Sequence, residues 1–256
     1  MELLKANFLL TTTQLVLGSN TDLASYLFDR DTSYQYVTSG FAGNTTTTIR
    51  VNFLETTSVS RIALVEHNLK AFRMYYDGAT ANAFSFLSGD TSTSVYTTNS
   101  ETSKYFNFTP VNCTSVSFDL SDTIVANNEK AIGYMVISAV QHAFDRVAPA
   151  KGYKPKIDSI DVVHKLSDGG TRVQKISEKH MVDLNYQHVS VTEKRALKEV
   201  WRFAGEMIFA PFGTTTGWDG VIFPCIWEGP FDFEEFSDNA VDAGFTGKIN
   251  LLETPE

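Results

Sequence analysis

Three adjacent polar residues, Glu66, His67 and Asn68, follow an apolar run and are the first candidates for chemistry. A histidine beside a carboxylate can act as a general base or bind a metal. The other parts of such a site are missing from the sequence, which has no Gly-x-Ser-x-Gly motif, no His-Glu-x-x-His motif and only scattered histidines. We therefore predict no metal centre and interpret the triplet as polar groups that satisfy backbone hydrogen bonds where a strand ends.

The segment WEGPFDFEEF holds the densest group of acids, at Glu228, Asp232, Glu234 and Glu235. Two carboxylates in one cleft are the machinery of a glycoside hydrolase, which is one interpretation. In an extended chain, however, Asp232 and Glu234 lie on one face and Glu235 on the other. Solvated acids on a strand edge explain the same residues and also discourage unwanted strand pairing. We therefore predict no enzyme activity and no catalytic residues.

The segment LFDRDTSYQY, residues 27–36, contains the remaining candidate ligands. Asp29, Asp31 and Thr32 supply oxygen atoms, which are the ligands that calcium takes in proteins. The same side chains also form Asx turns, in which they accept hydrogen bonds from nearby backbone N–H groups. We therefore predict no cofactor, with calcium as the alternative that the turn leaves open. Neither GxxxxGK[ST] nor GxGxxG occurs, so nucleotide binding has no support.

Charge and apolar content exclude several classes of partner. The 256 residues include 21 Lys and Arg against 30 Asp and Glu, a formal charge of −9, and contain no basic run. We predict no tight binding of nucleic acid, because tracking phosphates needs clustered cations. The amino end, MELLKANFLL, is too short an apolar run for a secretory signal, and no run reaches the roughly 18 residues of a membrane span. We expect synthesis in the cytoplasm, and Cys113 and Cys225 as buried free thiols.

The first half of the chain has the pattern of an antiparallel β-sandwich or barrel. Apolar residues alternate at Ile49, Val51 and Phe53 and again at Phe72, Met74 and Tyr76, with Ser, Thr, Asn and Gly between such runs. Alternation is lost in QHAFDRVAPAKGYKPKID, residues 141–158, which contains two prolines and a glycine. We place a domain boundary there, between domains at 1–145 and 146–256.

The second half is predicted to be mainly β with one helix. IDVVHKL, SDGG and TRVQKI form a hairpin with a glycine turn, and MVDLNYQHV is a third strand. Leu197, Val200 and Trp201 then follow the spacing of an amphipathic helix, at about residues 191–205. Ser190 with Glu193 fits a capping box, and Gly205 stands where a left-handed cap is expected. Strands follow to the end of the chain.

The order LFDRDTSYQY, TTIRVNFLE, SVSRIALVEHNLKAFRMYYDG, KYFNFTPVNCTSVSFDL and AIGYMVISAV resembles a discoidin-like, galactose-binding-like jelly roll over about residues 8–140. In that family the ligand usually contacts loops at one end of the sandwich. The resemblance therefore implies carbohydrate binding at the loops 28–36 and 40–46, through Asp29, Asp31, Tyr34 and Tyr36, with the tyrosine rings stacking on a sugar.

The helix at about 191–205 and the segments APFG, IWEGPFDFEEF and FTGKINLLE resemble the tail-tube-like domain of long-tailed bacteriophages, a β-sandwich or barrel with one helix, over about residues 155–256. This resemblance implies a distal or minor tail protein of the virion that forms a hexameric or trimeric ring around the tail axis, next to tail tube and tail-tip proteins. Asp232, Glu234 and Glu235 would lie at the ring interface or line the channel. The alternative is an adhesin module that binds glycans of the host surface.

Overall fold

The computed structural model describes residues 1–31, 33–87, 93–144, 153–165, 170–211, 222–235 and 244–254. Contacts divide the chain into two compact units. The N-terminal unit comprises Leu4–Val140 with 210–222, and the C-terminal unit comprises Met1–Leu3, Gln141–Phe209 and Phe223–Pro255. The division thus falls after Val140, whereas the boundary predicted between residues 145 and 146 lies outside the described residues.

The N-terminal unit is an antiparallel sheet with the strand order β3-β8-β4-β7-β5-β6, and β2 pairs with β4. Its strands are β2 (Leu15–Leu17), β3 (Tyr36–Val37), β4 (Thr47–His67), β5 (Leu69–Tyr76), β6 (Val95–Tyr96), β7 (Lys104–Thr123) and β8 (Ala131–Ser138). Two short 3-10 helices, η1 (Thr12–Gln14) and η2 (Thr21–Leu27), lie between β1 and β3 in sequence.

The two long strands β4 and β7 run through both layers of a sandwich. Their register shifts between Asn52 and Thr57, so the first part of β4 lies between β2 and β7 and the second part between β8 and β7. Side chains from both parts and from the neighbouring strands form one buried cluster, which includes Ile49, Val51, Ile62, Leu64, Phe72, Phe106, Phe118 and Ile137. The β-sandwich predicted from the alternation is confirmed.

The C-terminal unit is built on a second sheet with the order β10-β11-β15-β13-β12-β1-β9, in which β14 also pairs with β15. The strands are β1 (Glu2–Lys5), β9 (Val140–Ala143), β10 (Tyr153–Lys165), β11 (Thr171–Val189), β12 (Met207–Ala210), β13 (Phe223–Glu228), β14 (Phe233–Glu235) and β15 (Phe245–Glu253). Because β1 belongs to this sheet, the first residues group with the C-terminal unit and not with the N-terminal unit as predicted.

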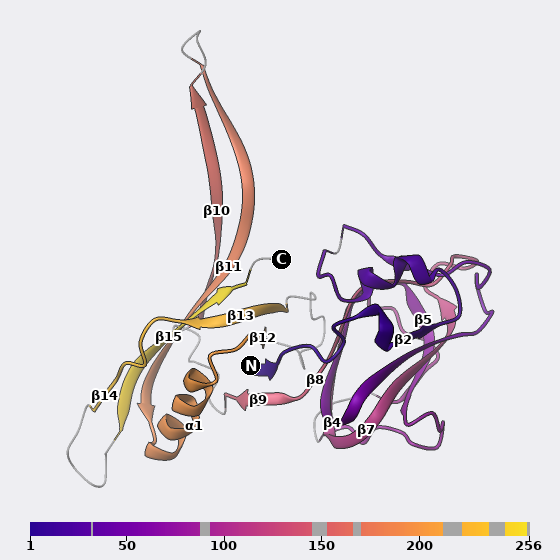
Figure 1. The fold of residues 1–256 in the computed structure, drawn as a ribbon, viewed down its shortest axis with the longest axis horizontal. Coiled ribbons are helices and arrows are strands. Elements are labelled where there is room, and N and C mark those ends of the chain that lie inside the picture. The colour runs from indigo at the N-terminus through magenta and orange to yellow at the C-terminus, as the bar shows by residue number, and fades with distance from the viewer. Residues whose placement is uncertain are drawn as a thin grey trace. The chain divides into compact units, whose positions relative to one another are not determined.

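The hairpin of the C-terminal unit differs from the prediction. The segments TRVQKI and MVDLNYQHV, predicted as two strands, belong to the single 19-residue strand β11. From Met181 to Leu184 β11 pairs with β10 on one side and β15 on the other, but from Thr171 to His180 it pairs with β10 alone. The outer part of the hairpin therefore extends beyond the other strands of its sheet (Figure 1).

The predicted helix is confirmed as α1 (Val191–Arg202), three residues shorter than expected at its end. Ser190 caps it, since its side chain accepts a hydrogen bond of 3.1 Å from the Glu193 N–H. The left-handed residue after the helix is Ala204, with φ 49°, and not Gly205 as predicted. Within the described residues, no helix is both long and apolar enough to cross a membrane.

The two cysteines are buried free thiols, as predicted. Burial raises the pKa of the Cys113 thiol to about 12 and that of the Cys225 thiol further still. Both side chains therefore act as small apolar groups of the two cores.

Candidate functional site

The triplet Glu66, His67 and Asn68 joins several loops at one end of the N-terminal sandwich. The Gln35 side chain donates to the Glu66 carbonyl at 3.2 Å. On the other side, the His67 N–H donates to the Thr102 carbonyl at 2.6 Å. The Asn68 side chain donates to the Glu129 carbonyl at 2.7 Å and accepts from the Ala131 N–H at 2.9 Å. These are the strand-end hydrogen bonds that the sequence predicts, and they bring the loops before β3, before β7 and before β8 to one end.

His67 is 2% exposed and belongs to the scaffold of this end. Its Nδ1 accepts a hydrogen bond from the Leu69 N–H at 3.1 Å, so the proton of the neutral ring is on Nε2. Burial, and secondly the charge of Lys104, lower the pKa of His67 to about 4. The ring is therefore neutral at ordinary pH. Among the described residues, no three His, Cys, Asp or Glu side chains are grouped so that they could hold a metal ion.

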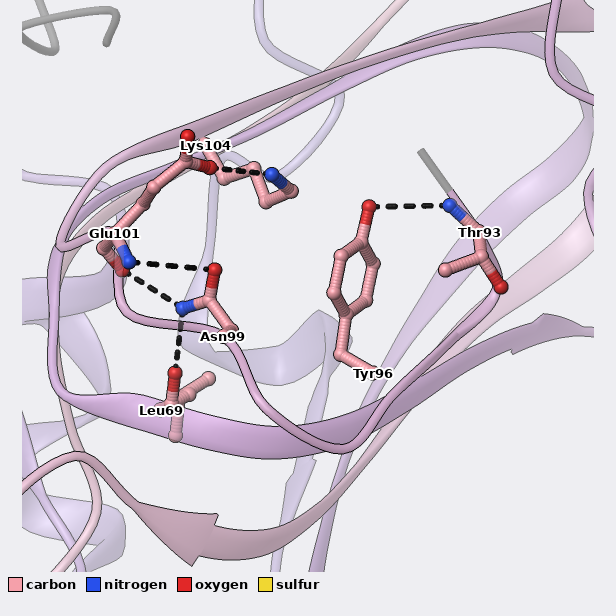
Figure 2. Close-up of polar contacts among 6 residues, drawn as sticks. All are labelled: Leu69, Thr93, Tyr96, Asn99, Glu101 and Lys104. Carbon is pink, nitrogen blue, oxygen red and sulfur yellow. Dashed lines mark hydrogen bonds and ion pairs between the residues drawn. The ribbon is translucent and has the colours of Figure 1, made fainter. Parts of the chain in front are cut away.

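A polar hollow of about 370 Å³ lies beside this triplet. It is formed by β6, the loop that follows it and the first residue of β7. The lining consists almost wholly of hydroxyl, amide and charged side chains around one aromatic ring: Thr93, Val95, Tyr96, Thr97, Thr98, Asn99, Ser100, Glu101 and Lys104. Figure 2 shows the central residues of this hollow, Tyr96 on one side and Asn99, Glu101 and Lys104 on the other.

Asn99 fixes the loop that forms the floor of the hollow. Its side-chain N–H groups donate to the carbonyls of Leu69, at 2.7 Å, and Glu101, at 2.8 Å (Figure 2). Its backbone N–H donates to the Lys70 carbonyl at 2.9 Å. The loop between β6 and β7 is thus tied to β5, which holds the polar groups of the hollow in fixed positions.

The two charges of the hollow, Glu101 and Lys104, form an ion pair. The Lys104 Nζ also lies 5.1 Å from the centre of the Tyr96 ring, within cation–π range. The Tyr96 ring stacks on Phe72 with a centroid distance of 4.7 Å, and its hydroxyl oxygen accepts from the Thr93 N–H at 3.1 Å. The hollow therefore presents one carboxylate, one ammonium and one phenol oxygen, from Glu101, Lys104 and Tyr96, with the Tyr96 ring packed on Phe72.

The predicted sugar-binding residues separate in the structure. Tyr36 is 1% exposed, and its hydroxyl donates to the Ser19 carbonyl at 2.9 Å, so its ring belongs to the core and offers no face to a sugar. Tyr34 is 58% exposed and stacks on Tyr26 at 5.5 Å. The difference arises because Tyr36 lies on β3, whereas Tyr34 lies in the turn before it.

The candidate calcium ligands Asp29 and Asp31 form turns with the backbone. Asp29 Oδ1 accepts from the Asp31 N–H at 3.3 Å, and Asp31 Oδ1 accepts from the Ser33 N–H at 2.9 Å. Burial raises the pKa of the Asp29 carboxyl, which disfavours its charged form. Thr32 lies outside the described residues, and calcium binding at this turn stays an untested alternative to the prediction of no cofactor.

The loop 40–46, the second predicted contact region, is held by two residues that the sequence analysis missed. Glu129 accepts hydrogen bonds from the Thr38 hydroxyl at 2.6 Å and from the N–H groups of Gly40 and Phe41 at 3.0 and 3.1 Å. Lys130 is fully buried, and its Nζ donates to three loop carbonyls, those of Phe41, Gly43 and Thr45. The signal in the sequence is a lysine placed directly before the apolar strand AIGYMVIS.

The acids Asp232, Glu234 and Glu235 are exposed on and beside β14 of the C-terminal unit. None of the acids that could form a glycosidase pair in the sequence lines the hollow of the N-terminal unit. Their role in a ring interface or channel stays a prediction.

No known protein family matches this chain, and no curated protein does. Among solved structures, the chain is similar to chitosan-binding module 1 of a chitosanase/glucanase from Paenibacillus sp. IK-5, with 16% identity, a TM-score of 0.36, and coverage of 48% of this chain and 92% of that one. It is also similar to a CBM32 module from a family 31 glycoside hydrolase of Clostridium perfringens, with 17% identity, a TM-score of 0.35, and coverage of 51% and 98%. A pectin-binding module matches with 18% identity, a TM-score of 0.34, and coverage of 48% and 87%. Because these TM-scores lie below 0.5, a function for this chain has to come from the geometry of its own site.

Proposed function

We propose that the N-terminal unit is a non-catalytic carbohydrate-binding module and that the hollow around Tyr96 is its ligand site. The observation that carries this proposal is the lining of the hollow, in which hydroxyl and amide groups surround one carboxylate and one ammonium. A sugar presents several hydroxyl groups, each of which both donates and accepts hydrogen bonds. Ser, Thr and Tyr hydroxyls can meet either need, while Glu101 only accepts and Lys104 only donates.

The fixed geometry of the hollow supports binding. Asn99 holds the loop against β5, and Phe72 supports the Tyr96 ring from below. A ligand therefore orders few protein groups when it binds, which reduces the entropic cost of association. The Glu101–Lys104 pair keeps both charges near the hollow, where a sugar hydroxyl can bridge them.

The chemistry of the hollow supports binding over catalysis. Glycoside hydrolysis generally requires two carboxyl groups on either side of the scissile bond. Glu101 is the only carboxylate among the described lining residues. His67 is buried, and its unprotonated Nδ1 already accepts the Leu69 N–H, so it has no free lone pair that could take a proton from a substrate.

A glycan array followed by calorimetric titration of the full chain tests the proposal. We expect Glu101→Gln and Lys104→Met each to weaken binding by about tenfold, because each removes a charge-assisted hydrogen bond to the ligand. Glu55→Gln, which changes an exposed acid of β4 outside the hollow, is the matched control and should bind as the wild type does.

Two results contradict the proposal in different ways. If no sugar binds at roughly 10 mM, the unit is not a carbohydrate-binding module. If binding persists in the hollow variants but is lost in Tyr34→Ala, the module binds sugar at the loop predicted from the sequence, and the assignment of the hollow is wrong.

Self-assembly of the C-terminal unit is a second candidate function. The bacteriophage resemblance implies a ring protein of the tail, but none of the three similar solved structures is a tail protein. The observation in favour of assembly is that the outer part of the β10–β11 hairpin has open strand edges in the described part of the chain. Light scattering of the full chain over a concentration series tests this candidate, and a monomer at every concentration and salt would contradict it.

A further inference from the structure

The two charged side chains of the hollow around Tyr96 are paired with each other. Glu101 Oε2 and Lys104 Nζ form an ion pair, and the same Nζ lies 5.1 Å from the centre of the Tyr96 ring. Among the described residues that line the hollow, Glu101 and Lys104 are the only charged ones, so this lining is neutral as a whole. The charge that the hollow accepts in a ligand is therefore decided by this pair.

The two partners of the pair differ in their access to a ligand. The Glu101 side chain is 37% exposed and the Lys104 side chain 18%. Figure 2 shows the Lys104 Nζ between the Glu101 carboxylate and the Tyr96 ring. The other carboxylate oxygen, Glu101 Oε1, makes no hydrogen bond within the described part of the chain. A ligand can therefore reach the ammonium only beside the carboxylate.

The remaining polar side chains of the lining include hydroxyl groups that a ligand can use. The Tyr96 hydroxyl oxygen accepts from the Thr93 N–H at 3.1 Å, which leaves its own proton to donate. Thr97, Thr98 and Ser100 are exposed, and their hydroxyls make no hydrogen bond with the residues that the structure describes. Such groups bind the hydroxyls of a sugar, but they do not balance a charge that a ligand brings with it.

Two cations of β5 lie near the hollow but do not line it. Arg73 pairs with Val95 of the lining, but it directly follows Phe72, which stacks under the aromatic ring of the hollow. Because successive side chains of a strand point to opposite faces, the Arg73 side chain lies on the other face of β5. Lys70 forms an ion pair of 3.2 Å with Asp122. The Glu101–Lys104 pair is therefore the charge that a ligand meets in the described hollow.

A charged sugar fits this pair poorly, whatever the sign of its charge. A sugar carboxylate that approaches Lys104 comes to lie beside Glu101, and a sugar ammonium that approaches Glu101 comes to lie beside Lys104. In both cases like charges are brought together, and the ligand adds a charge that the lining does not balance. A neutral hydroxyl can instead donate to Glu101 and accept from Lys104 while the pair stays intact.

We propose that the Glu101–Lys104 pair makes the hollow selective for uncharged sugars. Glu101 rejects acidic sugars, and Lys104 rejects sugars that carry a protonated amine. Removing one partner leaves the charge of the other uncompensated, so the selection then shifts toward the sugar of opposite charge. This proposal rests on carbohydrate binding by the hollow, the proposed function, and specifies the class of ligand.

Titration of the full chain with matched sugars tests the selection. Each series consists of a hexose, its uronic acid and its amino sugar, for example galactose, galacturonic acid and galactosamine, with parallel series for glucose and mannose. At mildly acidic pH the uronic acid is ionised and the amine is protonated. In the series that binds, the wild type should hold the hexose about tenfold more tightly than either charged sugar.

Two variants should change the selection in opposite directions. Glu101→Gln should shift the ratio of the affinities for uronic acid and hexose by about tenfold toward the acid, because Lys104 loses its anionic partner. Lys104→Met should shift the ratio for amino sugar and hexose toward the amine by a similar factor. A merely distorted hollow would weaken all three sugars alike and leave these ratios unchanged. The matched control Arg73→Gln removes a cation outside the lining and should also leave them unchanged.

The outcomes separate the selection from carbohydrate binding as such. A wild type that prefers the uronic acid or the amino sugar rejects the selection and leaves carbohydrate binding standing. Ratios that stay the same in both Glu101→Gln and Lys104→Met show that the pair does not select the ligand. A changed ratio in Arg73→Gln assigns the selection to that cation and rejects our assignment. If no sugar binds in any series or on the glycan array, both proposals are wrong.

Discussion

Replacing Lys130 by methionine should destabilise the N-terminal unit far more than the same replacement of an exposed lysine. The Lys130 side chain is fully buried, and its Nζ donates to the carbonyls of Phe41, Gly43 and Thr45, the last two at 2.7 and 2.6 Å. Methionine keeps a similar apolar stem but removes all three donors. The loop 41–45 would then have three carbonyl groups without their partner.

The size of the effect follows from the surroundings of these carbonyls. The bond to Gly43 is buried, whereas those to Phe41 and Thr45 are partly buried, so water can replace the donor at two of the three. An unsatisfied buried group costs about 1–3 kcal/mol, and a partly hydrated one costs less. Removing the ammonium also relieves its desolvation, which lowers the pKa of Lys130 in the folded state. We expect a net loss of about 3 kcal/mol.

Urea denaturation followed by circular dichroism measures this loss, and hydrogen exchange of the 41–45 amides shows where it arises. Lys70→Met is the matched control, because the Lys70 side chain is 44% exposed and makes an ion pair of 3.2 Å with Asp122. That variant should lose less than about 1 kcal/mol. If Lys130→Met is as stable as the Lys70 control, the three hydrogen bonds do not hold the loop and our reasoning is refuted.

Three further predictions concern single residues. Burial lowers the pKa of His67 from 6.5 to about 4, so the unfolded state binds the proton at a higher pH than the folded state does. The free energy of unfolding should therefore be greatest above pH 6.5 and fall by up to about 3 kcal/mol towards pH 4. In urea titrations, His67→Gln should flatten this profile. The Thr38 hydroxyl is the main cause of a lowered pKa at Glu129, so the stability that Glu129 contributes is present above its ordinary pKa and is lost as the pH falls through the lowered pKa. Hydrogen exchange of the Gly40 amide should accelerate in that pH range. If it does not, Glu129 does not hold the loop 40–46 through these hydrogen bonds. Ser190→Ala should cost about 1 kcal/mol by removing the cap of α1, measured by tryptophan fluorescence in urea, and an unchanged midpoint would count against the cap.

Local periodicity predicted the strands and the helix whose contacting segments are close in sequence, or in which one face is apolar and the other polar. Ile49 and Val51 alternate with polar residues because one face of β4 meets the core, and that pattern is visible in the sequence. Leu197 and Val200 are buried on one side of α1, which again follows from spacing. In elements of this kind, the spacing of the apolar residues in the local sequence shows which side chains are buried.

The parts that the sequence did not predict depend on contacts between distant segments. Lys130 reaches carbonyls more than 80 residues away, and no local pattern records their positions. Tyr34 and Tyr36 have the spacing of one strand face, but the turn that ends before β3 breaks this period and buries only Tyr36. The hollow around Tyr96 was missed because it is made of Thr, Ser and Asn, which are equally common in ordinary loops.

The two candidate functions concern different units, and self-assembly would strengthen carbohydrate binding if both hold. If the hollow binds sugar as proposed, a single site of this size and polarity should bind weakly, because water competes for every hydroxyl and few apolar atoms are buried. Self-assembly of the C-terminal unit, the second candidate function, would place several N-terminal units in one assembly. Binding of a second unit to the same glycan then becomes intramolecular and raises the apparent affinity without any new contact to the sugar. Weak single sites and an assembling C-terminal unit are therefore the combination expected of a protein that holds repetitive glycan surfaces.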